Sequence, residues 1–136
     1  MHRTQLSSGI ATGIGGLPHR DAVDAATFVL RNMELPAIPT LPRRSPAEGS
    51  MAQAMVGMQG ITVGQYGSIA VDATLVDPLA PIVTDLDHDA FLGFRTFLEL
   101  AHEQQFVGPV KWQFVGPVSF GLALMRAGVP MSEAFE

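Results

Sequence analysis

The chain has 136 residues, of which 47% are hydrophobic and only 15% charged, and its formal net charge is −5. This balance argues against nucleic acid as a partner, because no basic stripe is present to neutralise phosphates. No apolar run approaches the roughly 18–20 residues that a membrane-spanning helix needs. The absence of cysteine excludes disulfides and agrees with a cytoplasmic protein.

The first third of the chain predicts a strand, a glycine turn, a helix and a second strand. Segment 8–14 is short and apolar and runs into Gly15-Gly16, as a buried strand entering a tight turn would. Asp21 is placed to cap a helix over 22–33, which has a broad apolar face. The proline-rich segment 35–46 cannot be helical, so we expect a short strand over 37–41 followed by a loop.

The rest of the chain predicts further helices and strands. We expect a short helix over 50–58, a hairpin over 61–72, a long helix over 85–106, a strand over 110–114 and a helix over 119–127 capped by Ser119. Another helix begins near Ser132, and Glu136 leaves it unfinished. We therefore expect a single domain over 1–136 that is truncated at its C-terminal end.

The pentapeptide FVGPV occurs twice, at 106–110 and at 114–118. Its period of eight residues is far below the ~20–50 residues of repeat architectures, so the two copies are interpreted as the two ends of one strand. Short buried strands alternating with helices predict an α/β fold with a parallel sheet, and such sheets bind ligands at the carboxyl ends of their strands. Only the second copy, with Gly116-Pro117, would lie at that edge.

Three kinds of ligand site are not supported by the details of the sequence. Gly13 and Gly15 begin a dinucleotide-binding pattern, but Pro18 occupies the position of the third glycine. The alternation of Asp85, Asp87 and Asp89 begins like a calcium loop, but its required later Gly and Glu are missing, so helix-start acids explain it better. His, Glu and Cys are too few at ligand spacing to form a zinc site.

Three stretches leave alternatives open. The turn at Gly15-Gly16 could merely reverse the chain, or it could also offer backbone N–H groups to a substrate carboxylate. His19 beside Asp21 could act as a catalytic pair or belong to a surface loop. Arg43-Arg44 could hold a carboxylate or phosphate, or form a solvated charged loop.

Segments of the chain resemble cobalamin-independent methionine synthase. TGIGGLPHRD is similar to the strand and turn that open the catalytic barrel of that family, and VKWQFVGPVSFGLAL is similar to a later strand and loop. LPAIPTLPRRSPAEGSMAQAM resembles the linking segment of shorter methionine synthase-like proteins, which belong to the superfamily of uroporphyrinogen decarboxylase.

The resemblance implies a partial (β/α)₈ TIM barrel, of about the first three strand–helix units with an inserted hairpin. It implies an enzyme of methionine biosynthesis that transfers a methyl group to a thiol such as homocysteine, with zinc in the full-length protein and none in this segment. The isolated chain would be inactive, and its catalytic residues are not assigned.

The residues expected to bind the small-molecule substrate, a thiol or a carboxylate, lie in three stretches: Ile14, Gly15, Gly16 and His19; Arg43 and Arg44; Gly116 and Pro117. Two alternatives remain. One is a decarboxylase-like member of the superfamily, which would need both arginines to hold substrate carboxylates. The other is a non-catalytic half-barrel that forms a homo-oligomer through its exposed edges.

Overall fold

The computed structural model describes residues 5–64, 68–77 and 79–135. Its regular elements, in chain order, are α1 (Ala22–Asn32), the 3₁₀ helix η1 (Pro46–Glu48), α2 (Ser50–Ala54), β1 (Ile61–Val63), β2 (Ile69–Val71), the 3₁₀ helix η3 (Asp89–Phe91), α3 (Leu92–Glu103), α4 (Pro117–Arg126) and α5 (Met131–Ala134). None of the helices in this part of the chain has both the length and the apolar content to cross a bilayer.

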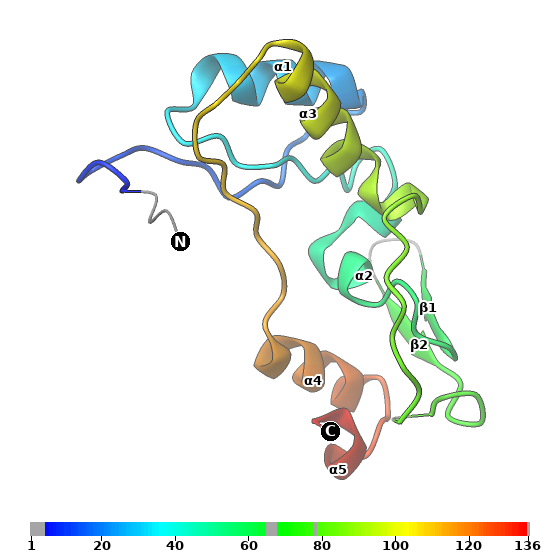
Figure 1. The fold of residues 1–136 in the computed structure, drawn as a ribbon. Coiled ribbons are helices and arrows are strands. Elements are labelled where there is room, and N and C mark those ends of the chain that lie inside the picture. The colour runs from blue at the N-terminus through cyan, green and yellow to red at the C-terminus, as the bar shows by residue number, and fades with distance from the viewer. Residues whose placement is uncertain (1–4, 65–67, 78, 136) are drawn as a thin grey trace.

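Helices α1 and α3 lie side by side at one end of the molecule (Figure 1). Asp21 caps α1 as predicted, because its carboxylate accepts a hydrogen bond of 2.9 Å from the N–H of Asp24. One face of each helix is apolar, and together these faces form the main core, which is completed by a residue of the proline-rich segment. Its buried members are Ala26, Val29, Ile38, Phe97 and Ala101.

Three extended segments lie beneath this helix pair and meet through single parallel bridges. Thr12 pairs with Leu35, Gly16 with Thr40, and Ala37 with Lys111. The middle segment, 35–41, therefore contacts segment 11–17 on one side and segment 110–112 on the other.

The expected α/β architecture, a partial (β/α)₈ TIM barrel with three strand–helix units, is wrong. The strands of the described residues are β1 and β2, which form a two-stranded antiparallel sheet, and no barrel repeat of strand and helix is present there. The prolines of the middle segment give a physical reason. Pro36 and Pro39 have no N–H to donate, so segment 35–41 makes isolated bridges instead of continuous ladders.

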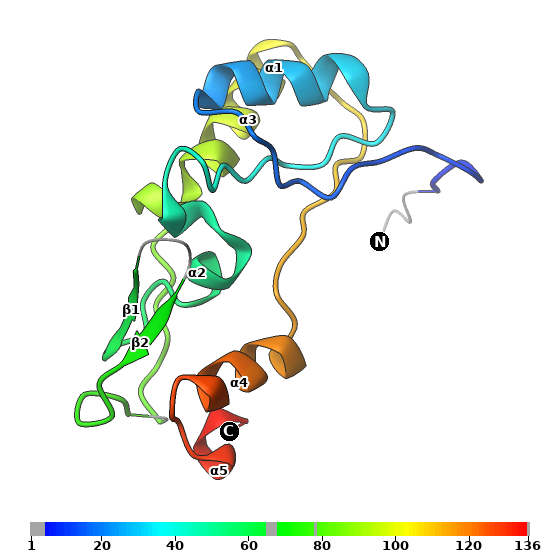
Figure 2. The same cartoon turned by 180° about the vertical axis from the view of Figure 1, so that it is seen from behind.

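The predicted hairpin is confirmed, with Ile61 opposite Val71 and Val63 opposite Ile69; residues 65–67 between its strands lie outside the described residues. It packs against α4 and α5 at the far end of the molecule, and segment 104–116 connects this end to α3 (Figure 2). A separate small core fills this end, formed by buried Leu124, Val129 and Ala134 with apolar side chains of the hairpin.

Several predicted helices are present with shifted ends. The helix expected over 85–106 is confined to α3 with η3 before it, and α2 ends at Ala54 instead of residue 58. Helix α4 begins at Pro117 with Gly116 as its N-cap, so Ser119 lies inside the helix and does not cap it. Proline is well suited to a first helical position, because the N–H that it lacks would have no partner there.

Candidate functional site

A groove opens where segments 11–17 and 35–41 end, and it encloses a cavity of about 260 Å³. Its lining comes from segments 11–17 and 35–41, from residues directly after segments 35–41 and 110–112, and from the start of α2. The lining residues are Ile14, Gly16, Ile38, Thr40, Pro42, Gly49, Ser50 and Gln113. The structure therefore brings two residues of the predicted glycine turn together with polar side chains from distant parts of the chain.

The glycine turn is held in place by backbone hydrogen bonds on both sides of Gly16. The N–H of Thr40 donates to the carbonyl of Gly15 at 2.9 Å, and the N–H of Leu17 donates to the carbonyl of Thr40 at 3.0 Å. Gly15 has a φ of +98°, and a Cβ there would lie 2.9 Å from the carbonyl oxygen of Ile38. Glycine is thus required at position 15 by the backbone conformation. Gly16 has no such restriction, and it lines the groove.

Four hydrogen-bonding groups of the groove have no partner among the described residues. They are the backbone N–H of Gly16, the hydroxyls of Thr40 and Ser50, and the side-chain amide of Gln113. All four can donate to an acceptor, and the lining contains no carboxylate that would repel an anion. The groove can therefore receive a small molecule with anionic oxygens.

Two basic residues adjoin the groove. Arg43 follows the lining residue Pro42, is exposed, and has no partner among the described residues. The Nζ of Lys111 donates to the carbonyl of Gly13 at 2.9 Å. Of the predicted arginine pair, Arg43 is the one whose guanidinium has no ion pair among the described residues.

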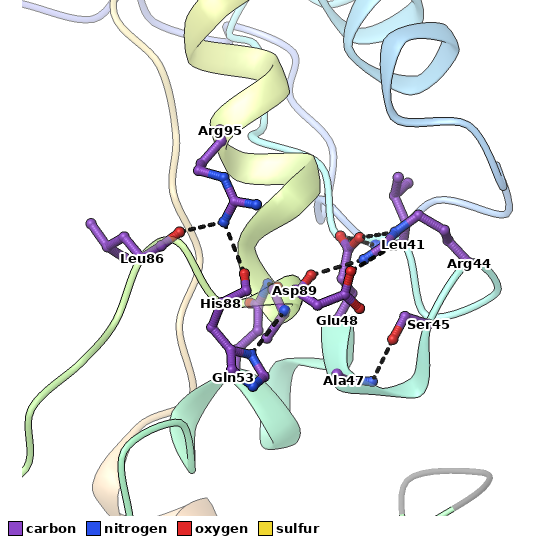
Figure 3. Close-up of polar contacts among 11 residues, drawn as sticks. Leu41, Arg44, Ser45, Ala47, Glu48, Gln53, Leu86, His88, Asp89 and Arg95 are labelled. Atoms are coloured by element: carbon purple, nitrogen blue, oxygen red, sulfur yellow. Dashed lines mark hydrogen bonds and ion pairs between the residues drawn. The ribbon is translucent and has the colours of Figure 1, made fainter.

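Arg44 is engaged elsewhere, in an ion-pair cluster beside η3 (Figure 3). Its Nε donates to the carboxylate of Glu48, and a terminal nitrogen donates to Asp89 Oδ1 at 3.0 Å. Its other terminal nitrogen donates to the backbone carbonyl of Asp89 at 2.8 Å. The guanidinium therefore ties η1 to η3, and its role in substrate binding stays a prediction.

The cluster changes the acidity of its members. Burial raises the pKa of Glu48 above its ordinary value, although the bond from Arg44 acts in the opposite direction. The Arg44 guanidinium lowers the pKa of Asp89. For Arg44 burial lowers the pKa, but its bonds to Asp89 and Glu48 outweigh that effect and raise it.

Glu48 is the residue of this cluster that the sequence interpretation missed. Its side chain is fully buried and accepts a hydrogen bond of 3.1 Å from the N–H of Leu41. A signal was present in the sequence, since Arg44 and Glu48 are four residues apart, a spacing that brings opposite charges together on a helical turn. The contact with Asp89, 45 residues away, has no such local signal.

The remaining predicted residues lie away from the groove lining. The ring of His19 packs against Phe28 with centroids 5.4 Å apart, and its Nδ1 is buried without a hydrogen-bond partner among the described residues. Pro117 lines a second cavity, near α4 and α5, and Gly116 caps α4. The structure thus places Gly116-Pro117 and the glycine turn at different cavities.

The described residues contain no group of three or more His, Asp or Glu side chains placed to hold a metal ion. Of the three aspartates before α3, two have carboxylates that already have partners. Asp85 accepts a hydrogen bond from the N–H of Asp87, and Asp89 is paired with Arg44.

Comparisons of the chain with protein-family models, curated proteins and solved structures gave no match. The groove and the resemblance of the short segments are therefore the features that bear on function.

Proposed function

We propose that the groove at the Gly15-Gly16 turn binds the carboxylate of a small-molecule substrate. The observation that carries this proposal is the set of four unpartnered hydrogen-bonding groups around a cavity without acidic lining. Oxyanions bind well to backbone N–H groups at glycine turns, because glycine lets the ligand approach the main chain closely. Arg43 adds a positive charge beside the groove.

The reaction class that we propose for the intact protein is methyl transfer to a thiol such as homocysteine, in the cytoplasm. This step rests on the resemblance to cobalamin-independent methionine synthase. A methyl carbon would pass from its donor to the thiolate sulfur, and the donor would keep the electron pair of the broken bond. The described residues offer no ligand set for zinc, so the role proposed for this segment is to bind and orient the substrate carboxylate.

The decarboxylase-like alternative has less support from the side chains. It needs both Arg43 and Arg44 to hold substrate carboxylates, and the guanidinium of Arg44 is already shared between Glu48 and Asp89. The groove offers neutral donors and one adjoining free arginine, which suits a single carboxylate better than several.

A valine at position 16 tests the carboxylate site. A Cβ there would meet only the Thr40 hydroxyl, at 3.9 Å, so the side chain should fit the fold while covering the N–H of Gly16. We expect Gly16→Val to weaken homocysteine binding about ten-fold, the loss of roughly one charge-assisted hydrogen bond. The measurement is an NMR titration of the chain with homocysteine and with its analogue lacking the carboxyl group.

Gly116→Val is the matched control, because a Cβ at position 116 would meet no atom within 4 Å. It should leave homocysteine affinity unchanged. Equal affinity of the parent and Gly16→Val, or equal binding of homocysteine and its analogue, would show that the groove does not recognise the carboxylate.

Self-association is a second candidate, favoured by the open edge of segment 110–112. The N–H and C=O of Lys111 are both bonded to segment 35–41, so the backbone groups of Val110 and Trp112 point the other way. They have no partner among the described residues, and the side chains around them are exposed and apolar: Val107, Val110, Trp112 and Phe114. Such an edge is suited to pairing with another extended chain, here a second copy.

A further inference from the structure

The second cavity lies at the opposite end of the molecule, between helices α4 and α5 on one side and residues of segments 57–61, 76–77 and 80–82 on the other, and has a volume of about 320 Å³. That volume is within the range of about 300–1,000 Å³ typical of small-molecule sites. The two cavities share no lining residue, so an inference about this cavity does not depend on the proposed function.

The walls of this cavity are apolar and well anchored. Leu124, Val129 and Ala134 belong to a buried cluster, and Ile61 of β1 packs against it. Phe135 covers one side, where its ring lies so close to α4 that a Cβ on Gly121 would come within 2.3 Å of it. These contacts shape a preformed apolar surface.

The charges of the lining are of one sign. Asp77 and Glu133 are its charged residues, both acidic, and the lining contains no Lys, Arg or His. Asp77 Oδ1 accepts a hydrogen bond of 2.9 Å from the N–H of Leu79, which leaves its other oxygen available. The carboxylate of Glu133 has no partner among the described residues.

We propose that this cavity binds a small molecule with an apolar body and a protonated amine. The apolar body would fill the space between the hairpin and the helices, where burial of its surface supplies the affinity. The ammonium group would lie at the carboxylates of Asp77 and Glu133, which would reject an anion of the same shape. Charge thus selects the ligand class, and the apolar walls hold it.

Three small aromatic probes of similar size test this selection: phenethylamine, phenylethanol and phenylacetate. Backbone NMR titrations of the whole chain would follow the amides of the lining residues. Because exposed ion pairs contribute modestly, we expect the amine to bind about two- to five-fold tighter than the alcohol, and the carboxylate to bind weakest. The advantage of the amine should shrink in roughly 1 M salt, where the Debye length is about 3 Å.

Two kinds of variant locate the site. Glu133→Gln should reduce the preference for the amine over the alcohol and leave alcohol binding unchanged, whereas Glu99→Gln, on the distant α3, should change neither. Ala80→Trp places a large ring on an exposed lining residue and should weaken both probes at least about five-fold.

Equal affinities for the amine and the alcohol would overturn the proposal, and so would unchanged binding in Ala80→Trp. If none of the probes shifts the amides of the lining, the cavity is not a small-molecule site.

Discussion

The pKa of the buried Glu48 carboxylate depends on the groups around it. Its carboxylate is removed from water and accepts bonds from Arg44 and from the N–H of Leu41. Burying an ion pair costs desolvation energy that the attraction between the charges offsets only in part. The raised pKa of Glu48 reflects this cost.

The pH dependence of stability follows from the direction of that shift. The folded chain holds the proton of Glu48 to a higher pH than the unfolded chain, whose carboxyl has the ordinary pKa of 4.5. The contribution of Glu48 to folding stability is therefore fully present below the ordinary pKa of 4.5, and it is lost as pH rises through the raised pKa. Glu48→Gln removes this titration, so we expect the variant to gain stability relative to the parent over that window. Urea denaturation at several pH values measures it.

For Asp89→Asn, in the same cluster, we expect the stability difference from the parent to change with pH in the opposite direction. The pKa of Asp89 is lowered by Arg44, so its contribution is present above the ordinary value of 3.8 and is lost as pH falls through the lowered pKa. The parent should therefore gain stability over Asp89→Asn as pH rises.

A stability difference between parent and Glu48→Gln that does not vary with pH would contradict the shift assigned to the pKa of Glu48.

At the scale of elements, the packing of α1 on α3 supplies the main core. Phe97 of α3 is fully buried in the cluster with Ala26 and Val29 of α1. Its neighbour Leu98 points away and is 44% exposed. Successive helical positions differ by about 100°, so adjacent residues can have opposite environments.

This contrast gives a paired prediction for α3. Phe97→Ala should lower the free energy of unfolding by about 3–5 kcal/mol, because it removes buried ring surface and leaves a cavity. Leu98→Ala should change it by less than about 1 kcal/mol, since the side chain already contacts water. Chemical denaturation of both variants measures the difference, and similar losses would mean that α3 does not pack on α1 through Phe97.

At the scale of the whole molecule, segment 104–116, which has little regular structure, connects α3 at one packed end to α4 at the other (Figure 1). The bridged residue Lys111 attaches this segment to the first end, while Val110 and Trp112 leave its outer edge open. Much apolar surface therefore remains exposed, in keeping with the low charge of the sequence.

Self-association through this edge predicts a mass that rises with protein concentration in analytical ultracentrifugation. Val110→Lys should weaken the association about ten-fold or more, because a charge on an edge opposes pairing. Val118→Lys, on an exposed face of α4, is the control and should associate like the parent. A monomer at all concentrations, or equal effects of the two lysines, would argue against the edge as the interface.

The sequence by itself determined the local elements of this protein. The Asp21 cap, the apolar faces of α1 and α3, and the antiparallel hairpin follow from residues close together in the chain, so their patterns could be recognised directly. The glycine turn was also recognised, and the structure places Ile14 and Gly16 at a groove. The ends of the helices were less predictable, because capping depends on details such as Pro117 and Gly116.

Only the tertiary structure decided how these elements combine. Short apolar stretches alternating with helices predicted a parallel sheet, and the resemblance implied a barrel, but prolines without N–H groups left isolated bridges between extended segments. The groove joins Gly16 to Gln113, and the ion pairs join Arg44 to Asp89. Contacts between residues so far apart in the chain depend on how the helices pack, and a local sequence pattern carries no record of that packing.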